Sequence, residues 1–157
     1  MPILKVNSVN LYFEVSGAGH PILALTPLLL DHMFLRPLAQ ALAKNYLVIS
    51  LDVLGHGLSD KPKDEKLYSY ENLANHCYQL IGHMNINKHD IVGISWSGRI
   101  ALTYTLLHQN NVRALILIAS SGPKQKPTTP QISPEWSPRE RFVVEIAYRC
   151  PTMFPET

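Results

Sequence analysis

The stretch from Ile91 to Ala101 carries the residues best suited to chemistry. It reads Ile-Val-Gly-Ile-Ser-Trp-Ser-Gly-Arg-Ile-Ala, so an apolar run leads into a turn of small residues with Ser95 at its apex. A helix is predicted to begin at Ser97, directly after the turn. A serine at such a sharp strand-to-helix turn sits in a strained backbone conformation and exposes its hydroxyl. The pattern predicts Ser95 as a catalytic nucleophile.

The neighbours of Ser95 must be small, because the strand and helix backbones nearly touch at such a turn. Gly93 meets this requirement on the strand side, whereas the helix side carries Ser97 followed by Gly98. Serine adds only a hydroxymethyl group, so we expect a tight fit rather than exclusion. The amide of Trp96 directly follows the nucleophile and is a candidate oxyanion donor.

Alternating strands and helices are predicted to position this turn. Short runs that are apolar at almost every position are typical of strands buried on both faces, and here they alternate with amphipathic helix patterns. The runs are Ile22–Thr26, Tyr46–Leu51, Asp90–Ile94 and Val112–Ala119, and the helices are Asp31–Lys44, a helix capped by Ser69, and Ser97–Gln109. An antiparallel hairpin, Ile3–Val6 with Val9–Val15, precedes them. The predicted fold class is α/β, a mostly parallel sheet flanked by helices.

Together these segments resemble the α/β-hydrolase fold family from Ile3 to Pro123. The serine turn looks like the family's nucleophile elbow. The segment Leu-Asp-Val-Leu-Gly-His-Gly-Leu-Ser-Asp, residues 51–60, looks like the aspartate and Gly-x-Gly-x-Ser loop after the fourth strand. The resemblance implies a serine hydrolase of the esterase or lactonase kind, with only the N-terminal portion of the fold present and truncation after the sixth strand and the start of the lid.

The resemblance also assigns roles to residues outside the elbow. Family members usually carry His-Gly after the third strand, and the next residue donates its amide to the oxyanion. Thr26-Pro27 stands there in this sequence, so the second donor would be the amide of Leu28. The histidine of the Gly-His-Gly loop, His56, is expected to be structural, and Asp52 and Asp60 are expected to satisfy backbone amides in that loop.

A general base and the acid that orients it are expected after the nucleophile in this family. No aspartate follows Ser95, and the one histidine that does is His108, about 15–17 Å away along the helix. His32, near the oxyanion loop, is an unfavoured substitute. Two explanations stay open: a fragment of an enzyme whose remainder lies elsewhere, or a free-standing chain that has lost its triad.

Two segments are expected along the chain. Residues 1–122 form the N-terminal part of the hydrolase core. Residues 123–157, rich in proline, form a partial cap or lid with one helix that begins at Ser137. The strand Val112–Ala119 would be an exposed apolar edge, which predicts a homodimer, a tail folded over the edge, or poor solubility.

Composition limits the remaining possibilities. Over 157 residues, 46% are hydrophobic and 17% are charged, the formal net charge is +2, and no basic block suggests nucleic acid or membrane partners. Two distant cysteines and the absence of an apolar leader favour a cytoplasmic protein. No cofactor or metal is implied. The leading hypothesis is hydrolysis of a small acyl substrate, an ester or lactone, and the alternative is a non-catalytic remnant acting as an interaction module through its edge strand.

Overall fold

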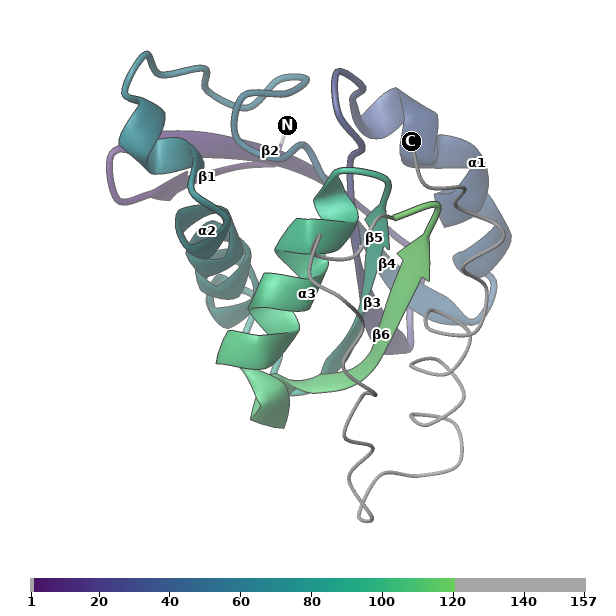
Figure 1. The fold of residues 1–157 in the computed structure, drawn as a ribbon. Helices are drawn as coiled ribbons and strands as arrows, with labels where there is room; N and C mark the ends of the chain where they lie inside the picture. Colours follow the sequence, from purple (N-terminus) through teal and green to yellow (C-terminus); the bar gives the residue numbers. More distant parts are fainter. Residues whose placement is uncertain (1, 121–157) are drawn as a thin grey trace.

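The computed structural model describes residues 2–120, which form one mixed sheet with helices on both faces (Figure 1). The strands are β1 (Ile3–Val6), β2 (Val9–Ser16), β3 (His20–Leu25), β4 (Tyr46–Leu51), β5 (His89–Ile94) and β6 (Val112–Ile118). The helices are α1 (His32–Leu42), α2 (Tyr70–His83) and α3 (Ser97–Leu107), with 3₁₀ turns η1 (Glu65–Tyr68) and η2 (Gln109–Asn111). The predicted proline-rich segment 123–157 lies outside the described residues.

The sheet order is β1-β2-β4-β3-β5-β6. The hairpin of β1 and β2 is antiparallel, and β2 pairs antiparallel with β4, whereas β4, β3, β5 and β6 run parallel to one another. The predicted α/β class and its alternating βαβ units are therefore confirmed. Within residues 2–120, β6 pairs with β5 alone, so it is an edge of the described sheet.

Helices cover both faces of the sheet, as Figure 1 shows with α1 on one side and α2 and α3 on the other. The burial of alternate residues explains why β3 is apolar from Pro21 to Leu25. Leu23 and Leu25 pack in the larger core with α2 and α3, and Ile22 and Ala24 pack in the smaller core with α1. All four side chains are buried. The sheet is thus fixed from both faces, and its carboxyl edge presents the loops that carry the candidate chemistry.

Helix boundaries follow local capping chemistry. The Asp31 side chain accepts a hydrogen bond from the Met33 amide and begins α1, and the Ser69 hydroxyl accepts one from the Asn72 amide and begins α2. Helix α3 has no such side-chain cap, because it starts directly out of the turn that contains Ser95. Its amino end therefore lies at the carboxyl edge of the sheet.

Candidate functional site

Ser95 occupies the turn between β5 and α3 with a φ angle of 55°. Its amide donates a hydrogen bond of 2.8 Å to the Ile118 carbonyl of β6, and its carbonyl accepts one of 3.1 Å from the Gly98 amide. A left-handed conformation at a non-glycine residue costs about 1–3 kcal/mol. The neighbouring strand and helix hold the backbone in this conformation, and the residue is exposed.

Strand β5 and helix α3 approach each other closely at the turn, as the small residues there predict. A Cβ atom added at Gly93 would lie 2.5 Å from the Gly98 Cα atom and 2.8 Å from the Ser97 carbonyl oxygen. A Cβ atom added at Gly98 would overlap the Ser120 side chain. Only glycine fits these two positions without a backbone shift.

Ser97, which stands where the family pattern has glycine, is fully buried in the turn. Its hydroxyl oxygen accepts a hydrogen bond of 2.9 Å from the Ile94 amide. The hydroxyl also lies 3.2 Å from the Leu25 carbonyl and 3.0 Å from the Ile94 carbonyl, either of which can accept its proton. The expected tight fit is confirmed, and the side chain also links the ends of β3 and β5, which the sequence did not indicate.

Two backbone amides at the carboxyl edge of the sheet have no hydrogen-bond acceptor among the described residues. Within residues 2–120, neither the Trp96 amide nor the Leu28 amide donates a hydrogen bond. Leu28 lies in a turn closed by a 3.3 Å hydrogen bond from the Leu30 amide to the Pro27 carbonyl, and Leu29 in that turn has a φ of 62°. The proline lacks an N–H, but it leaves the following amide available.

A row of aromatic rings lies beside Ser95. The Trp96 ring stacks on His56, with centroids 5.1 Å apart and planes at 28°, and it contacts Tyr70 at 6.4 Å on another side. The Arg99 guanidinium lies 5.0 Å from the centre of the Tyr70 ring. We call the three rings of His56, Trp96 and Tyr70, together with the Arg99 guanidinium, the aromatic row. The sequence did not reveal it, because its members come from three separate segments of the chain.

The aspartates of the loop after β4 act as structural acceptors, but only the Asp52 carboxylate accepts a backbone amide of that loop, as expected for it. Asp52 is fully buried, and its carboxylate accepts hydrogen bonds from the His32 amide at 2.6 Å and the Leu58 amide at 2.8 Å. The Asp60 carboxylate accepts one of 2.7 Å from the Asn10 amide in β2. Both carboxylates therefore join the loop to other elements and hold it in place.

The three histidines considered in the sequence, His32, His56 and His108, contact groups other than the Ser95 hydroxyl. His32 Nδ1 lies 2.8 Å from Asp52 Oδ2, and His56 Nδ1 lies 3.3 Å from the Leu54 carbonyl. His108 caps the carboxyl end of α3, about 16 Å along the helix from its first residue. Its ring stacks on Tyr78, with centroids 3.9 Å apart. Within residues 2–120, none of these rings is hydrogen-bonded to the Ser95 hydroxyl.

A comparison with protein families decides what this arrangement belongs to. The alpha/beta hydrolase fold family matches residues 31–149, about three quarters of the chain and a stretch that includes the elbow and its flanking elements. The chain belongs to the alpha/beta hydrolase fold family. This confirms both the resemblance seen in the sequence and the fold class.

Relatives of this alpha/beta hydrolase are themselves hydrolases. A 2-hydroxymuconate semialdehyde hydrolase from Pseudomonas sp. (strain CF600) is 34% identical over 110 residues, which is 68% of this chain and 38% of the relative. The chain thus spans well under half the length of that relative.

Solved structures give the same result. Est816, described as an N-acyl homoserine lactone degrading enzyme, matches with a TM-score of 0.72 and 28% identity over 76% of this chain and 45% of its own. The enol-lactonase from Burkholderia xenovorans LB400 matches with a TM-score of 0.70 and 25% identity over 76% and 47%. The matched part of this chain therefore has the fold of somewhat under half of each of these two enzymes.

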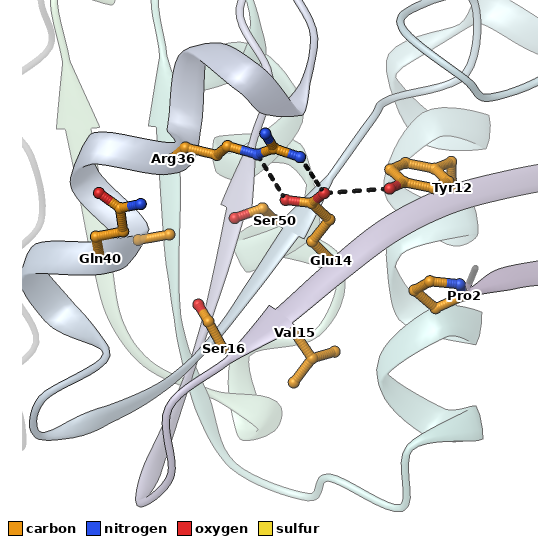
Figure 2. Close-up of a pocket in the computed structure, with 9 residues that line it drawn as sticks. Pro2, Tyr12, Glu14, Val15, Ser16, Arg36, Gln40 and Ser50 are labelled. Carbon is orange, nitrogen blue, oxygen red and sulfur yellow. Dashed lines mark hydrogen bonds and ion pairs between the residues drawn. The ribbon is translucent and has the colours of Figure 1, made fainter.

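A hollow of this alpha/beta hydrolase, about 380 Å³ in volume, lies between β2 and α1, away from the elbow (Figure 2). Arg36 of α1 reaches over Glu14 of β2 with a 2.9 Å ion pair, and the Tyr12 hydroxyl donates to the same carboxylate at 3.2 Å. The Arg36 hydrogen bond lowers the pKa of Glu14. The charged groups of this hollow already neutralise one another, so it is a weaker candidate site than the elbow.

Residues 2–120 contain neither a metal-ligand cluster nor a membrane-spanning helix. No group of three or more histidine, cysteine, aspartate or glutamate side chains there is arranged to hold a metal ion. No helix in that part of the chain is long and apolar enough to cross a membrane. The elbow and the loops around it remain the candidate active site.

Proposed function

We propose that this chain provides the nucleophile of a serine hydrolase that cleaves an ester, a lactone or a related acyl compound. In this proposal the Ser95 oxygen attacks the substrate carbonyl carbon, and the amides of Trp96 and Leu28 donate hydrogen bonds to the oxyanion that forms. The leaving group departs to give an acyl-serine, and water then attacks this ester and regenerates the hydroxyl.

The observation that carries the proposal is the backbone of Ser95. A φ of 55° at an exposed serine between a strand and a helix costs free energy, and such strain is retained where the surrounding structure needs it. Helix α3 begins two residues after Ser95, and the amino end of a helix favours developing negative charge. The unoccupied amides of Trp96 and Leu28 supply the donors that an oxyanion needs.

The proton acceptor of the reaction is proposed to come from outside this chain's sequence. No aspartate follows Ser95, and the one histidine that does, His108, sits at the opposite end of α3. The Pseudomonas relative is more than twice as long as the stretch that matches, so its further length has room for an acid and a histidine. We therefore propose that the chain alone is chemically incomplete and turns over slowly.

The substrate class is proposed from the relatives' names. They include a 2-hydroxymuconate semialdehyde hydrolase, an N-acyl homoserine lactone degrading enzyme and an enol-lactonase. Each of these names describes a small carbonyl compound. Because such relatives are hydrolases, a purely non-catalytic interaction module is the less favoured alternative.

Two further expectations remain proposals. We propose a cytoplasmic location, with which the free buried thiol of Cys77 is compatible, since burial raises its pKa to about 12 and leaves it unreactive. We also propose a homodimer formed through β6, because that strand presents backbone groups and the exposed Ile118 at the edge of the described sheet.

A fluorophosphonate probe tests the nucleophile. We expect covalent labelling of the wild-type chain and none of Ser95→Ala. Ser8→Ala is the matched control, because Ser8 is also exposed in a turn but lies in the β1–β2 hairpin, and it should label like the wild type. Equal labelling of wild type and Ser95→Ala would refute the proposal.

A further inference from the structure

Among the arginines within residues 2–120, Arg99 is the one that has no acidic partner. Within residues 2–120, Arg36 pairs with Glu14 at 2.9 Å and Arg113 pairs with Asp90 at 2.5 Å. No carboxylate of that region lies within 4.0 Å of the Arg99 guanidinium, and no protein acceptor there takes a hydrogen bond from it. The side chain is exposed, so its charge is not buried without compensation.

The position of this guanidinium is nevertheless defined. It lies 5.0 Å from the centre of the Tyr70 ring, within the range of a cation–π contact. A guanidinium that contacts an aromatic ring keeps N–H donors available, and these donors match the two oxygens of a carboxylate. Arg99 is thus oriented by a ring while its donors stay unfilled.

Arg99 lies on the helix turn that follows the proposed nucleophile. Arg99 lies in the first turn of α3, four residues after Ser95, and its amide donates a 3.2 Å hydrogen bond to the Trp96 carbonyl. Tyr70 is the first residue of α2, and its ring contacts the Trp96 ring at 6.4 Å. The aromatic row therefore joins the cation to the residue that follows the nucleophile.

The opposite side of the elbow has a different character. Leu28, Leu29 and Leu30 of the turn after β3 are all exposed, as are Met33 and Phe34 at the start of α1. A substrate lying over Ser95 would have an apolar surface on the β3 side and one unneutralised cation on the α2 side. This asymmetry favours a molecule with one charged end.

We propose that Arg99 binds a carboxylate carried by the acyl substrate, so that the enzyme prefers anionic acyl compounds to neutral ones of the same length. The inference rests on the proposed function, since it takes Ser95 as the point of attack. Tyr70 is the positioning residue for the guanidinium. The Ser95 step itself is unchanged, because the carboxylate binds through hydrogen bonds and takes no part in bond breaking.

Two p-nitrophenyl esters with five-carbon acyl groups test the preference, mono-p-nitrophenyl glutarate and p-nitrophenyl pentanoate. We measure single-turnover release of p-nitrophenolate and take the ratio of kcat/KM for the two esters. The ratio should fall about tenfold in Arg99→Gln and less in Arg99→Lys, which keeps the charge but loses the planar donors. Arg36→Gln removes the same charge at the β2–α1 hollow and should leave the ratio unchanged. An equal ratio in wild type and Arg99→Gln would overturn the inference.

A binding experiment separates this inference from the proposed function. In Ser95→Ala, the side-chain Nε–H signal of Arg99 is followed by NMR during titration with monomethyl glutarate, and Arg99→Gln identifies the signal. A saturable shift with the monoester and none with the neutral dimethyl glutarate supports the assignment even if Ser95 is not acylated. No saturable shift with either compound would refute it whatever the esters show.

Discussion

Replacing Gly93 by alanine tests whether the close approach of β5 and α3 is a requirement of the fold. Gly93 does not have a positive φ, so alanine meets no backbone restriction there. The added Cβ atom would instead lie 2.5 Å from the Gly98 Cα atom, 2.8 Å from the Ala101 Cβ atom and 2.8 Å from the Ser97 carbonyl oxygen. The effect of the substitution is therefore purely steric.

The size of the effect follows from these distances. Carbon atoms in contact prefer about 3.5–4.0 Å, so α3 must move away from β5 by on the order of 1 Å. Two of the three contacts are backbone atoms, which cannot rotate away as a flexible side chain does. Overpacking typically costs about 1–3 kcal/mol, and three simultaneous overlaps place Gly93→Ala near 3 kcal/mol.

Gly82→Ala is the matched control, since nothing lies within 4 Å of a Cβ atom added there in α2. Alanine is a better helix former than glycine, so this variant should gain about 0.5–1 kcal/mol. Urea unfolding followed by circular dichroism measures both, and with an m value of about 2 kcal/mol/M the two midpoints should differ by nearly 2 M. If Gly93→Ala unfolds at or above the wild-type midpoint, the steric argument is wrong.

Three other measurements test separate features. Burial lowers the pKa of His89 to about 4, so the unfolded chain binds a proton that the folded chain does not as pH falls below about 6.5. Between pH 7.5 and pH 5 the wild type should therefore lose about 2 kcal/mol more stability than His89→Leu, which still contains His76 and His108 with pKa values lowered by burial. Parallel urea midpoints in the two proteins would contradict this. Asp52→Asn replaces a buried carboxylate acceptor and should cost about 2–4 kcal/mol in thermal unfolding, so an unchanged midpoint would show that the loop does not depend on its charge. Light scattering should find a dimer that Ile118→Lys converts to monomer, and a monodisperse wild-type monomer would exclude the proposed edge pairing.

The fold was largely predictable from the sequence because its signals are local. The inner parallel strands β3 and β5 are largely buried, so runs such as Ile22–Thr26 are mostly apolar and stand out from the helices, and the structure differs only at the ends, with β3 at His20–Leu25. Ser69 was predicted as a cap and accepts the Asn72 amide, as its residue type favours. The elbow was visible because steric limits on Gly93 and Gly98 restrict residue type within a few positions.

The surroundings of the elbow were not predictable, because they depend on contacts between distant segments. The Ser97 hydroxyl lies 3.2 Å from the Leu25 carbonyl, 72 positions earlier in the chain, and no periodicity encodes such a contact. The stacking of His56 on Trp96 and the placement of Arg99 over Tyr70 likewise arise only when the sheet assembles. Residue type alone therefore predicts the nucleophile but not the groups around it.

The three hydrogen bonds to the Asp52 carboxylate make distant loops open together. One carboxylate holds the His32 amide and ring at the start of α1 and the Leu58 amide in the loop after β4. Releasing either loop leaves a buried charge short of partners, which raises the free energy of the partly opened state. In hydrogen–deuterium exchange, the amides of His32 and Leu58 should therefore exchange with one common opening free energy, as a single cooperative unit within the fold.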